Sequence, residues 1–125
     1  MGRAEPSALV WIFPDCHNAA SCKKFSRDLD RFLADKYQPR MIFDLSHVRT
    51  MNALGIDLLL KSAVRISSCD GELKLAGAST QTTLVLELTQ LNQVLEVFPT
   101  VEEAIASLNT PSFQNRSREV MDRAA

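Results

Sequence analysis

The sequence predicts an α/β fold in a single domain, with a mostly parallel sheet of four to five strands and helices packed against it. Short apolar runs, typical of buried strands, alternate along the chain with longer amphipathic segments of helical period. The chain has 125 residues, of which 46% are hydrophobic, and this is enough for one core. Right-handed crossovers between parallel strands leave few possible topologies.

The first strand and the first helix come before residue 40. Residues 8–13 form a continuous apolar run that Pro14 stops, so we expect a buried strand there. In the segment 18–37, apolar residues recur at helical spacing and charged residues fill the other face, which predicts an amphipathic helix closed by Pro39. The apolar positions are Phe25, Leu29, Phe32 and Leu33.

The second strand and the second helix occupy the middle of the chain. Residues 41–45 are mainly apolar and predict a strand, and a helix is expected to begin after Asn52 and to end at the turn Asp70-Gly71. Its predicted apolar stripe consists of Ile56, Leu59, Leu60, Ala63 and Ile66. The aromatic residues Trp11, Phe13 and Phe43 are expected in the core.

The last part of the domain continues the alternation. Residues 72–76 alternate as a half-buried strand does, residues 80–88 predict a short helix, and residues 94–98 predict a final strand. Thr100 and Glu103 form a capping box, which predicts that a last helix begins there. We therefore expect a domain over 8–109, preceded by an extension over 1–7. Residues 110–125 are expected to be a tail, or a helix that orders only on a partner.

Charge and cysteine content narrow the class of protein. The net charge of −1 and the pI near 6.1 give no electrostatic case for nucleic acid or acidic membranes. No apolar run approaches the roughly 20 residues that a membrane-spanning helix needs. The N-terminus has an acid and a proline where a signal peptide needs its apolar segment. Three cysteines, Cys16, Cys22 and Cys69, cannot all pair within one chain, which fits a reducing compartment. We therefore expect a cytoplasmic protein.

The opening of the second helix is the most informative stretch. Function in parallel sheets gathers at the carboxyl ends of the strands, and the loop 46–52 follows the second strand directly. The unpaired N–H groups and the positive dipole end of a helix opening suit anion binding or a phosphorylation switch. A switch needs a hydroxyl in the last turn of the loop, and this chain has Ala53 and Leu54 there.

Several motifs in order resemble one family. The strand Ile42-Phe43-Asp44-Leu45-Ser46 is followed by Asn52-Ala53-Leu54-Gly55 and then by Ile56-Asp57-Leu58-Leu59-Leu60. Farther along come Leu86-Glu87-Leu88-Thr89-Gln90-Leu91, Val97-Phe98 and Thr100-Val101-Glu102-Glu103-Ala104. From about Leu9 to Leu108 the chain resembles the STAS domain, named for sulphate transporters and anti-sigma factor antagonists. The resemblance implies a STAS-like single domain.

The departures from the family pattern bear on regulation. In anti-anti-sigma members, a serine directly after the motif's aspartate is phosphorylated by a kinase that is also the anti-sigma factor. This chain has Asn52 in place of the aspartate and Ala53 in place of the serine, so position 53 is a degenerate phosphosite. Asn52 remains a good helix N-cap. The resemblance therefore implies a binding module without the usual off-switch, either a constitutive antagonist or a decoy that competes with a switchable relative.

The expected partner is an anti-sigma factor with serine kinase activity, and a homodimer is possible. The predicted contact surface joins the loop to the start of the second helix, and Arg65 follows one turn farther on. Its residues are Val48, Arg49, Thr50, Met51, Asn52, Ala53, Leu54, Gly55, Asp57 and Lys61. Two alternatives stay open: an accessory STAS subunit that braces the ATPase subunit of a membrane transporter, such as a lipid-trafficking ABC system, or a STAS domain that senses a small ligand.

The remaining polar candidates have simple structural interpretations. Cys16 and His17 with Cys22 lack the number and paired spacing of ligands that a structural zinc site needs, so we expect no metal. Asp44 has no adjoining acid that would make it a phosphate acceptor of the receiver type. Asp57 is expected to complement the helix dipole, and Cys69 to lie at a helix end.

Three hydroxyl residues are alternative candidates for phosphorylation: Ser46, Thr50 and Ser62. His47 lies in the loop 46–52, where it either senses pH or contacts a partner, or caps the strand end and faces water. No serine-histidine-acid set, glycine-rich phosphate loop or metal-binding carboxylate cluster appears in the sequence. We therefore expect no enzyme activity and no cofactor.

Overall fold

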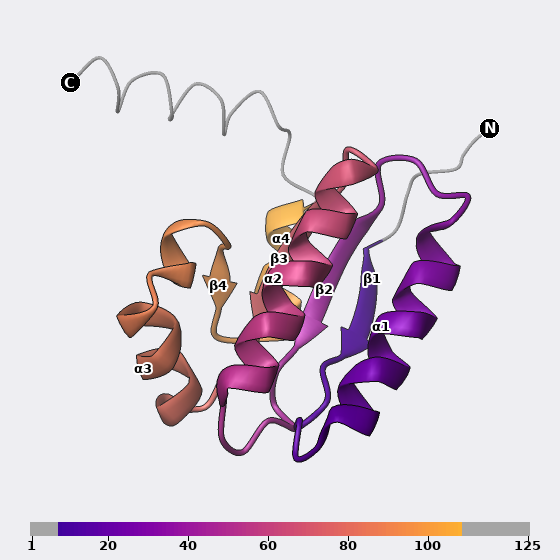
Figure 1. Cartoon of the computed structure of the whole chain (residues 1–125). Helices are drawn as coiled ribbons and strands as arrows, with labels where there is room; N and C mark the ends of the chain where they lie inside the picture. Colours follow the sequence, from indigo (N-terminus) through magenta and orange to yellow (C-terminus); the bar gives the residue numbers. More distant parts are fainter. Residues whose placement is uncertain (1–7, 109–125) are drawn as a thin grey trace.

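The structure is a computed structural model and describes residues 8–108 (Figure 1). Within this range the chain alternates between strands and helices as the sequence predicts. The elements in order are β1 (Leu9–Ile12), α1 (Ala19–Leu33), β2 (Arg40–Asp44), α2 (Ala53–Ser68), β3 (Glu72–Ala76), α3 (Thr80–Leu88), the 3₁₀ turn η1 (Leu91–Gln93), β4 (Val97–Phe98) and α4 (Val101–Leu108).

The four strands form one sheet in the order β1-β2-β3-β4, and every neighbouring pair is parallel. The register places Trp11 beside Phe43, and Phe43 beside Leu75. The prediction of a mostly parallel sheet of four to five strands is confirmed, because the described sheet has four strands and all are parallel. The carboxyl ends of β1 and β2 therefore lie side by side at one end of the molecule.

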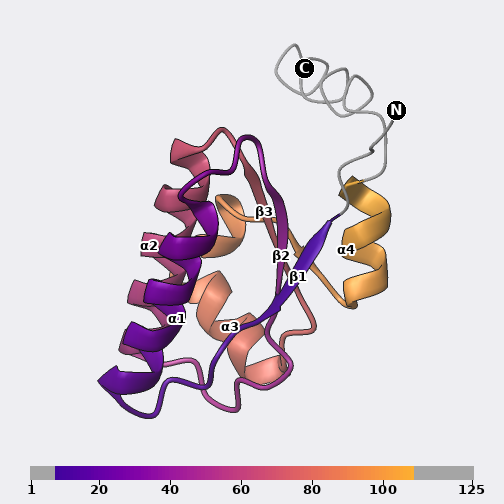
Figure 2. The same ribbon diagram turned by 90° about the vertical axis from the view of Figure 1, so that its right-hand side faces the viewer.

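Helices cover both faces of the sheet. Figure 2 shows α1, α2 and α3 on one face and α4 on the other. The larger core lies under the three helices, and a smaller apolar cluster joins α4 to β2 and β3. The smaller cluster consists of Ile42, Ala76, Ala104 and Leu108. This layered arrangement leaves the loops at the carboxyl ends of the strands at the surface.

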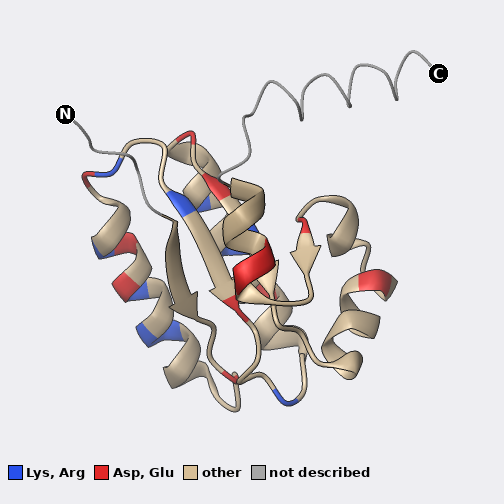
Figure 3. Cartoon of the chain, turned by 180° about the vertical axis from the view of Figure 1, so that it is seen from behind, with Lys and Arg blue, Asp and Glu red and all other residues tan. Residues whose placement is uncertain are grey.

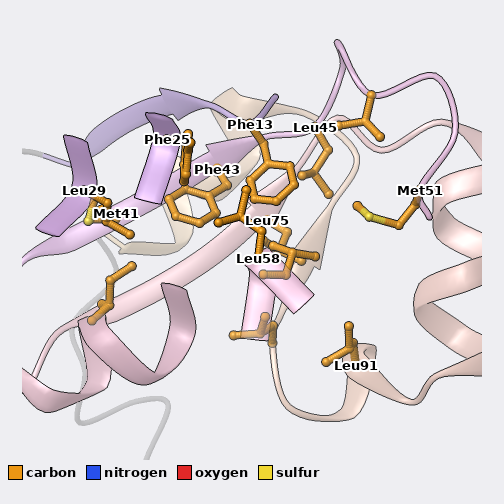
Figure 4. Close-up of a cluster of buried hydrophobic side chains, with 14 of the residues drawn as sticks. Phe13, Phe25, Leu29, Met41, Phe43, Leu45, Met51, Leu58, Leu75 and Leu91 are labelled. Carbon is orange, nitrogen blue, oxygen red and sulfur yellow. The ribbon is translucent and has the colours of Figure 1, made fainter. Parts of the chain in front are cut away.

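Aromatic rings form the centre of the larger core (Figure 4). The ring of Phe43 is 0% exposed, and its centroid lies 5.6 Å from that of Phe13 and 5.3 Å from that of Phe25. Trp11 packs edge-on against Phe25 at 5.7 Å. Edge-on and tilted pairs at these separations are the favoured geometries for aromatic rings. The prediction of a core position is confirmed for Phe13 and Phe43, whereas Trp11 is half-buried and packs against the core from the edge strand.

The first strand is less buried than the sequence indicates. Leu9, Val10 and Ile12 are exposed, whereas the apolar run predicts a buried strand. The physical reason is that β1 is an edge strand, and α4 packs mainly against β2, β3 and β4. An apolar run alone does not distinguish an edge strand from a central one.

The other boundaries differ by a few residues. The helix α1 ends at Leu33, short of the predicted limit at residue 37. The final strand has two residues, because Gln90 takes a left-handed conformation (φ 64°) and the chain continues as η1 before it reaches the sheet. The predicted extension over 1–7 and the predicted tail over 110–125 lie outside the described residues.

The end of α2 and the start of α4 follow the predicted signals. Beyond α2, Asp70 has φ 58° and the N–H groups of Asp70 and Gly71 donate to the carbonyls of Ser67 and Ile66, each at 2.9 Å. This paired arrangement closes a helix end in the manner of a Schellman motif. The Thr100 hydroxyl accepts a hydrogen bond from the N–H of Glu103 at 3.1 Å, as expected for the start of α4.

Charges of both signs are interspersed on the surface of α1 (Figure 3). Lys24 and Asp28 form an ion pair one turn apart at 3.0 Å, and Asp30 pairs with Arg65 of α2. Exposed ion pairs contribute only about 0.2–1 kcal/mol each to stability. The mixed signs on α1 agree with the nearly neutral net charge of the chain.

Candidate functional site

The loop between β2 and α2 starts at a turn that Asp44 stabilises. Its Oδ1 accepts a hydrogen bond from the N–H of Ser46 at 3.0 Å, and the N–H of Leu45 donates to the carbonyl of Ala76 at 2.8 Å. Gly77 adopts φ 74°, and a Cβ there would lie 3.1 Å from Asp44 Oδ1. Asp44 thus has a structural role at the end of the strand.

Three of the predicted contact residues hold the loop from inside. Val48 is 3% exposed and Met51 is 4% exposed, so both side chains belong to the core. The N–H of Met51 donates to Gln81 Oε1 of α3 at 3.0 Å. Gly55 is also buried, and a Cβ at that position would lie 2.6 Å from Met51 Sδ. The predicted surface is therefore narrowed to its exposed members, which are Arg49, Thr50, Asn52, Ala53, Leu54, Asp57 and Lys61.

Asn52 connects two parts of the site. Its Oδ1 accepts a hydrogen bond from the N–H of Gly55 at 2.9 Å, which caps α2 as the sequence predicts. Its Nδ2 donates to the carbonyl of Cys16 at 2.9 Å, in the loop between β1 and α1. An aspartate at position 52 would keep the first bond and lose the second, because a carboxylate has no N–H to donate. This second bond accounts for asparagine at the position.

We expect Asn52→Ala to lower the free energy of unfolding by about 2 kcal/mol, since it removes a cap and leaves the Cys16 carbonyl without its donor. The matched variant Asn52→Asp keeps the cap, and its loss is expected to be at most about 1 kcal/mol. Urea unfolding followed by circular dichroism measures both values. Equal losses in the two variants would contradict the assignment of two separate roles to this side chain.

The neighbouring loop after β1 carries further links to the site. Asp15 is half-buried and its carboxylate lies 3.6 Å from Arg49 Nε and 3.1 Å from His17 Nε2. Cys16 and Cys22 form a disulfide. Within residues 8–108, no group of three or more His, Cys, Asp or Glu side chains is placed to hold a metal ion. The third cysteine, Cys69, caps the far end of α2, as expected.

The outer face of α2 differs from the predicted stripe. The apolar stripe predicts that Leu60 is buried, but Leu60 is 44% exposed. Leu54 and Val64 are also exposed, at 42% and 65%. These apolar residues lie beside the ion pair of Asp57 with Lys61, at 3.0 Å. The helix is apolar on more than one side, so the apolar pattern could not tell its outer face from its inner one. The exposed position of Val64, one turn after Leu60, was missed for the same reason.

The candidate alternative phosphorylation sites differ in how exposed their side chains are. Ser46, His47 and Thr50 are exposed, whereas Ser62 is 2% exposed. The Ser62 hydroxyl has no hydrogen-bond partner among the described residues. A kinase cannot reach this side chain in the folded domain, so Ser62 is not a phosphorylation site of the native state.

We expect Ser62→Ala to raise the free energy of unfolding by about 1 kcal/mol, because an unpaired buried hydroxyl is costly. Ser68→Ala in the same helix is the control, since the Ser68 hydroxyl is exposed and donates to the carbonyl of Val64 at 2.9 Å. The control corrects for the helix propensity of alanine, which both variants share. Urea unfolding that shows no greater gain for Ser62→Ala would contradict the buried, unpaired hydroxyl.

Comparison with protein families gives a match over most of the described chain. The family model for the STAS domain matches residues 15–104, which include the whole β2–α2 loop. The chain belongs to the STAS domain family. The predicted resemblance and the predicted fold class are therefore confirmed. The comparison with curated protein sequences gives no match.

Solved structures similar to this STAS domain come from two kinds of protein. One is an anti-sigma factor antagonist (STAS) domain protein from Planctomyces limnophilus, with 26% identity over 81% of this chain and 90% of that chain and a TM-score of 0.62. A putative anti-sigma factor antagonist from Thermotoga maritima has 22% identity over 83% of this chain and 82% of that chain, with a TM-score of 0.62. The STAS domain of a SulP transporter from Vibrio cholerae has 17% identity over 86% of this chain and 84% of that chain, with a TM-score of 0.70. The fold of this STAS domain is thus shared by antagonists and by transporter domains.

The helices of this STAS domain are short. The longest, α2, has 16 residues, and no helix within residues 8–108 is long and apolar enough to cross a membrane.

Proposed function

We propose that this STAS domain is a non-catalytic, cytoplasmic module that binds an anti-sigma factor with serine kinase activity and lacks the phosphoserine off-switch. The observation that carries the proposal is the opening of α2, where the capped turn of the family is intact and Ala53 is exposed in place of the serine. The likeness to the Planctomyces limnophilus antagonist also supports it.

The chemistry of the exposed surface suits a protein partner. Leu54, Leu60 and Val64 expose apolar area, and the Asp57–Lys61 pair lies beside them. Protein interfaces commonly combine apolar anchors with a polar rim. An apolar Leu54 next to Ala53 also gives the partner a surface without charge at the position where phosphate would be attached in a switchable relative.

The missing hydroxyl has a direct consequence for control. Phosphorylation adds a charge of about −1.5 to −2 and repels a partner surface that is packed against it. Ala53 has no oxygen to accept the phosphoryl group. A kinase bound to this domain would therefore have no hydroxyl to phosphorylate at position 53. The domain would stay bound and act as a constitutive antagonist.

A second candidate is a transporter-associated domain. The likeness in fold to the SulP transporter domain from Vibrio cholerae favours it. In that role the exposed apolar residues of α2 would contact the ATPase or the membrane-embedded subunit of a transporter.

Affinity capture from soluble and detergent-solubilised extracts of the native host, with partners identified by mass spectrometry, tests the proposal. The wild-type chain and a Tyr37→Glu control are expected to capture an anti-sigma kinase, and Ala53→Glu is expected to lose it. Tyr37 suits the control because it is 76% exposed and lies between α1 and β2, at the amino ends of the strands. Capture of a transporter subunit in place of a kinase would overturn the antagonist function in favour of the second candidate.

A further inference from the structure

A disulfide joins the loop after β1 to the first helix. Its two residues are Cys16 in the loop and Cys22 in the first turn of α1. Their Cα atoms are 5.9 Å apart, within the range of about 4.4–6.8 Å over which a disulfide forms without backbone movement. The remaining cysteine, Cys69, is a free thiol at the opposite end of α2. The pair is therefore preorganised to exist either as a disulfide or as two adjacent thiols.

The two residues of the pair differ in exposure. Cys16 is 2% exposed, whereas Cys22 is half-buried and lines a cavity of about 210 Å³ between α1 and α2. The same cavity is lined by Leu54 and Lys61, which belong to the predicted contact surface. A small thiol in this cavity would lie against Cys22 and beside Leu54 at the opening of α2.

Two interactions link the disulfide and its neighbour Asp15 to the loop between β2 and α2. The carbonyl of Cys16 accepts the hydrogen bond from Asn52 Nδ2 at 2.9 Å, and Asp15 lies 3.6 Å from Arg49 Nε. Closing a short ring in the chain reduces the conformations available to residues 16–22. An ordered Cys16 carbonyl then holds Asn52 in the rotamer that caps α2.

We propose that Cys16 and Cys22 form a thiol–disulfide exchange site for low-molecular-weight thiols and disulfides, and that its oxidised form orders the opening of α2. The regulation of the contact surface by this pair rests on the proposed function. Ala53 cannot be phosphorylated, so the redox state of Cys16 and Cys22 takes the place of phosphorylation in regulating the contact surface.

The exchange balances with a low-molecular-weight disulfide as the oxidant. The thiolate of Cys22 attacks the disulfide RSSR, forms a mixed disulfide and releases one RS⁻. The thiolate of Cys16 then attacks the sulfur of Cys22 in the mixed disulfide and releases the second RS⁻. The two protons of the protein thiols end on the released thiols, so that one RSSR is reduced to two RSH. In a reducing compartment the pair rests as thiols, and its oxidised fraction rises as RSSR accumulates.

The first test uses the full chain carrying Cys69→Ser, equilibrated with glutathione and glutathione disulfide in different ratios. Alkylation followed by mass spectrometry is expected to show a conversion from two modified cysteines to none as the fraction of glutathione disulfide rises. Amide hydrogen exchange by NMR is expected to be about tenfold slower at Gly55 in the oxidised form. The amide of Ala104 in α4 serves as the internal reference and is expected to exchange equally in both forms.

The variant Cys16→Ser/Cys22→Ser in the same background is expected to show no dependence on the glutathione ratio and to exchange at Gly55 like the reduced form. The proposal is overturned if the two cysteines remain alkylated at every ratio, if glutathione stays attached to Cys22, or if Gly55 exchanges at the same rate in both forms.

A binding measurement with the captured kinase then tests the regulatory consequence. The oxidised chain is expected to bind about tenfold more tightly, because its contact loop is already ordered. Equal affinity in the two states would overturn the regulation and leave the antagonist function intact. Absence of kinase binding in both states would overturn the proposed function. The alkylation and amide exchange measurements would still decide whether the pair is a thiol–disulfide exchange site.

Discussion

Ala53→Glu is expected to weaken binding of the anti-sigma kinase by at least about 30-fold and to change the free energy of unfolding by no more than about 0.5 kcal/mol. The loss of affinity follows because a carboxylate without a partner at a desolvated interface costs about 2–5 kcal/mol. The fold tolerates the change because position 53 is exposed and is the first residue of α2, where a negative charge complements the helix dipole.

Isothermal titration calorimetry with the purified kinase measures this effect, and urea unfolding measures the stability of the same variant. Tyr37→Glu adds the same charge far from the contact surface and is expected to bind within about threefold of the wild type. If Ala53→Glu binds as tightly as the control, the opening of α2 is not part of the interface.

Phe43→Ala is expected to lower the free energy of unfolding by about 3–5 kcal/mol. The ring is 0% exposed and packs between Phe13 and Phe25, so its removal leaves a cavity that its neighbours cannot fill. Natural domains have a total stability of only about 5–15 kcal/mol, so this variant is expected to lose a large fraction of its stability.

Phe98→Ala is the matched control, because Phe98 is half-buried in the two-residue strand β4, at the edge of the sheet. Its loss is expected to be about 1–2 kcal/mol, since less apolar area returns to water. Thermal and urea unfolding compare the two variants. Similar losses in both would contradict a core centred on Phe43.

The sequence predicts the regular elements best where a local signal is strong. The strand over 72–76 and the helix over 80–88 have the bounds that the structure gives. Alternation marks the strand in the sequence, and the structure shows that the Ser79 side chain caps the helix. Parallel pairing also follows from the alternation of strands and helices. Local patterns therefore suffice for the order of elements and for the fold class.

Position within the sheet is not contained in these patterns. The apolar residues of β1 resemble those of a central strand, but α4 covers its neighbours more than β1 itself, and Val10 and Ile12 remain exposed. Leu60 fits an apolar stripe in sequence and lies on the outer face of α2 in the structure. Which apolar face is covered depends on tertiary packing, which a single helical or strand period does not specify.

In the candidate site, too, local contacts could be predicted from the sequence and tertiary contacts could not. The cap by Asn52 is local and predictable, because acceptor and donor are three residues apart. The second hydrogen bond of Asn52 reaches Cys16, 36 residues away in sequence, and depends on β1 and β2 being neighbours. The link between the disulfide loop and the contact loop therefore became visible only in the structure.

The measurement that tests the central claim most directly is phosphorylation by the captured kinase with ATP, mapped by mass spectrometry and followed by release of the complex. The wild-type chain is expected to remain unphosphorylated and bound, whereas the double variant Asn52→Asp/Ala53→Ser is expected to be phosphorylated at position 53 and released. Phosphate on Ser46 or Thr50 of the wild-type chain, with release from the kinase, would contradict a binding module without a phosphorylation switch.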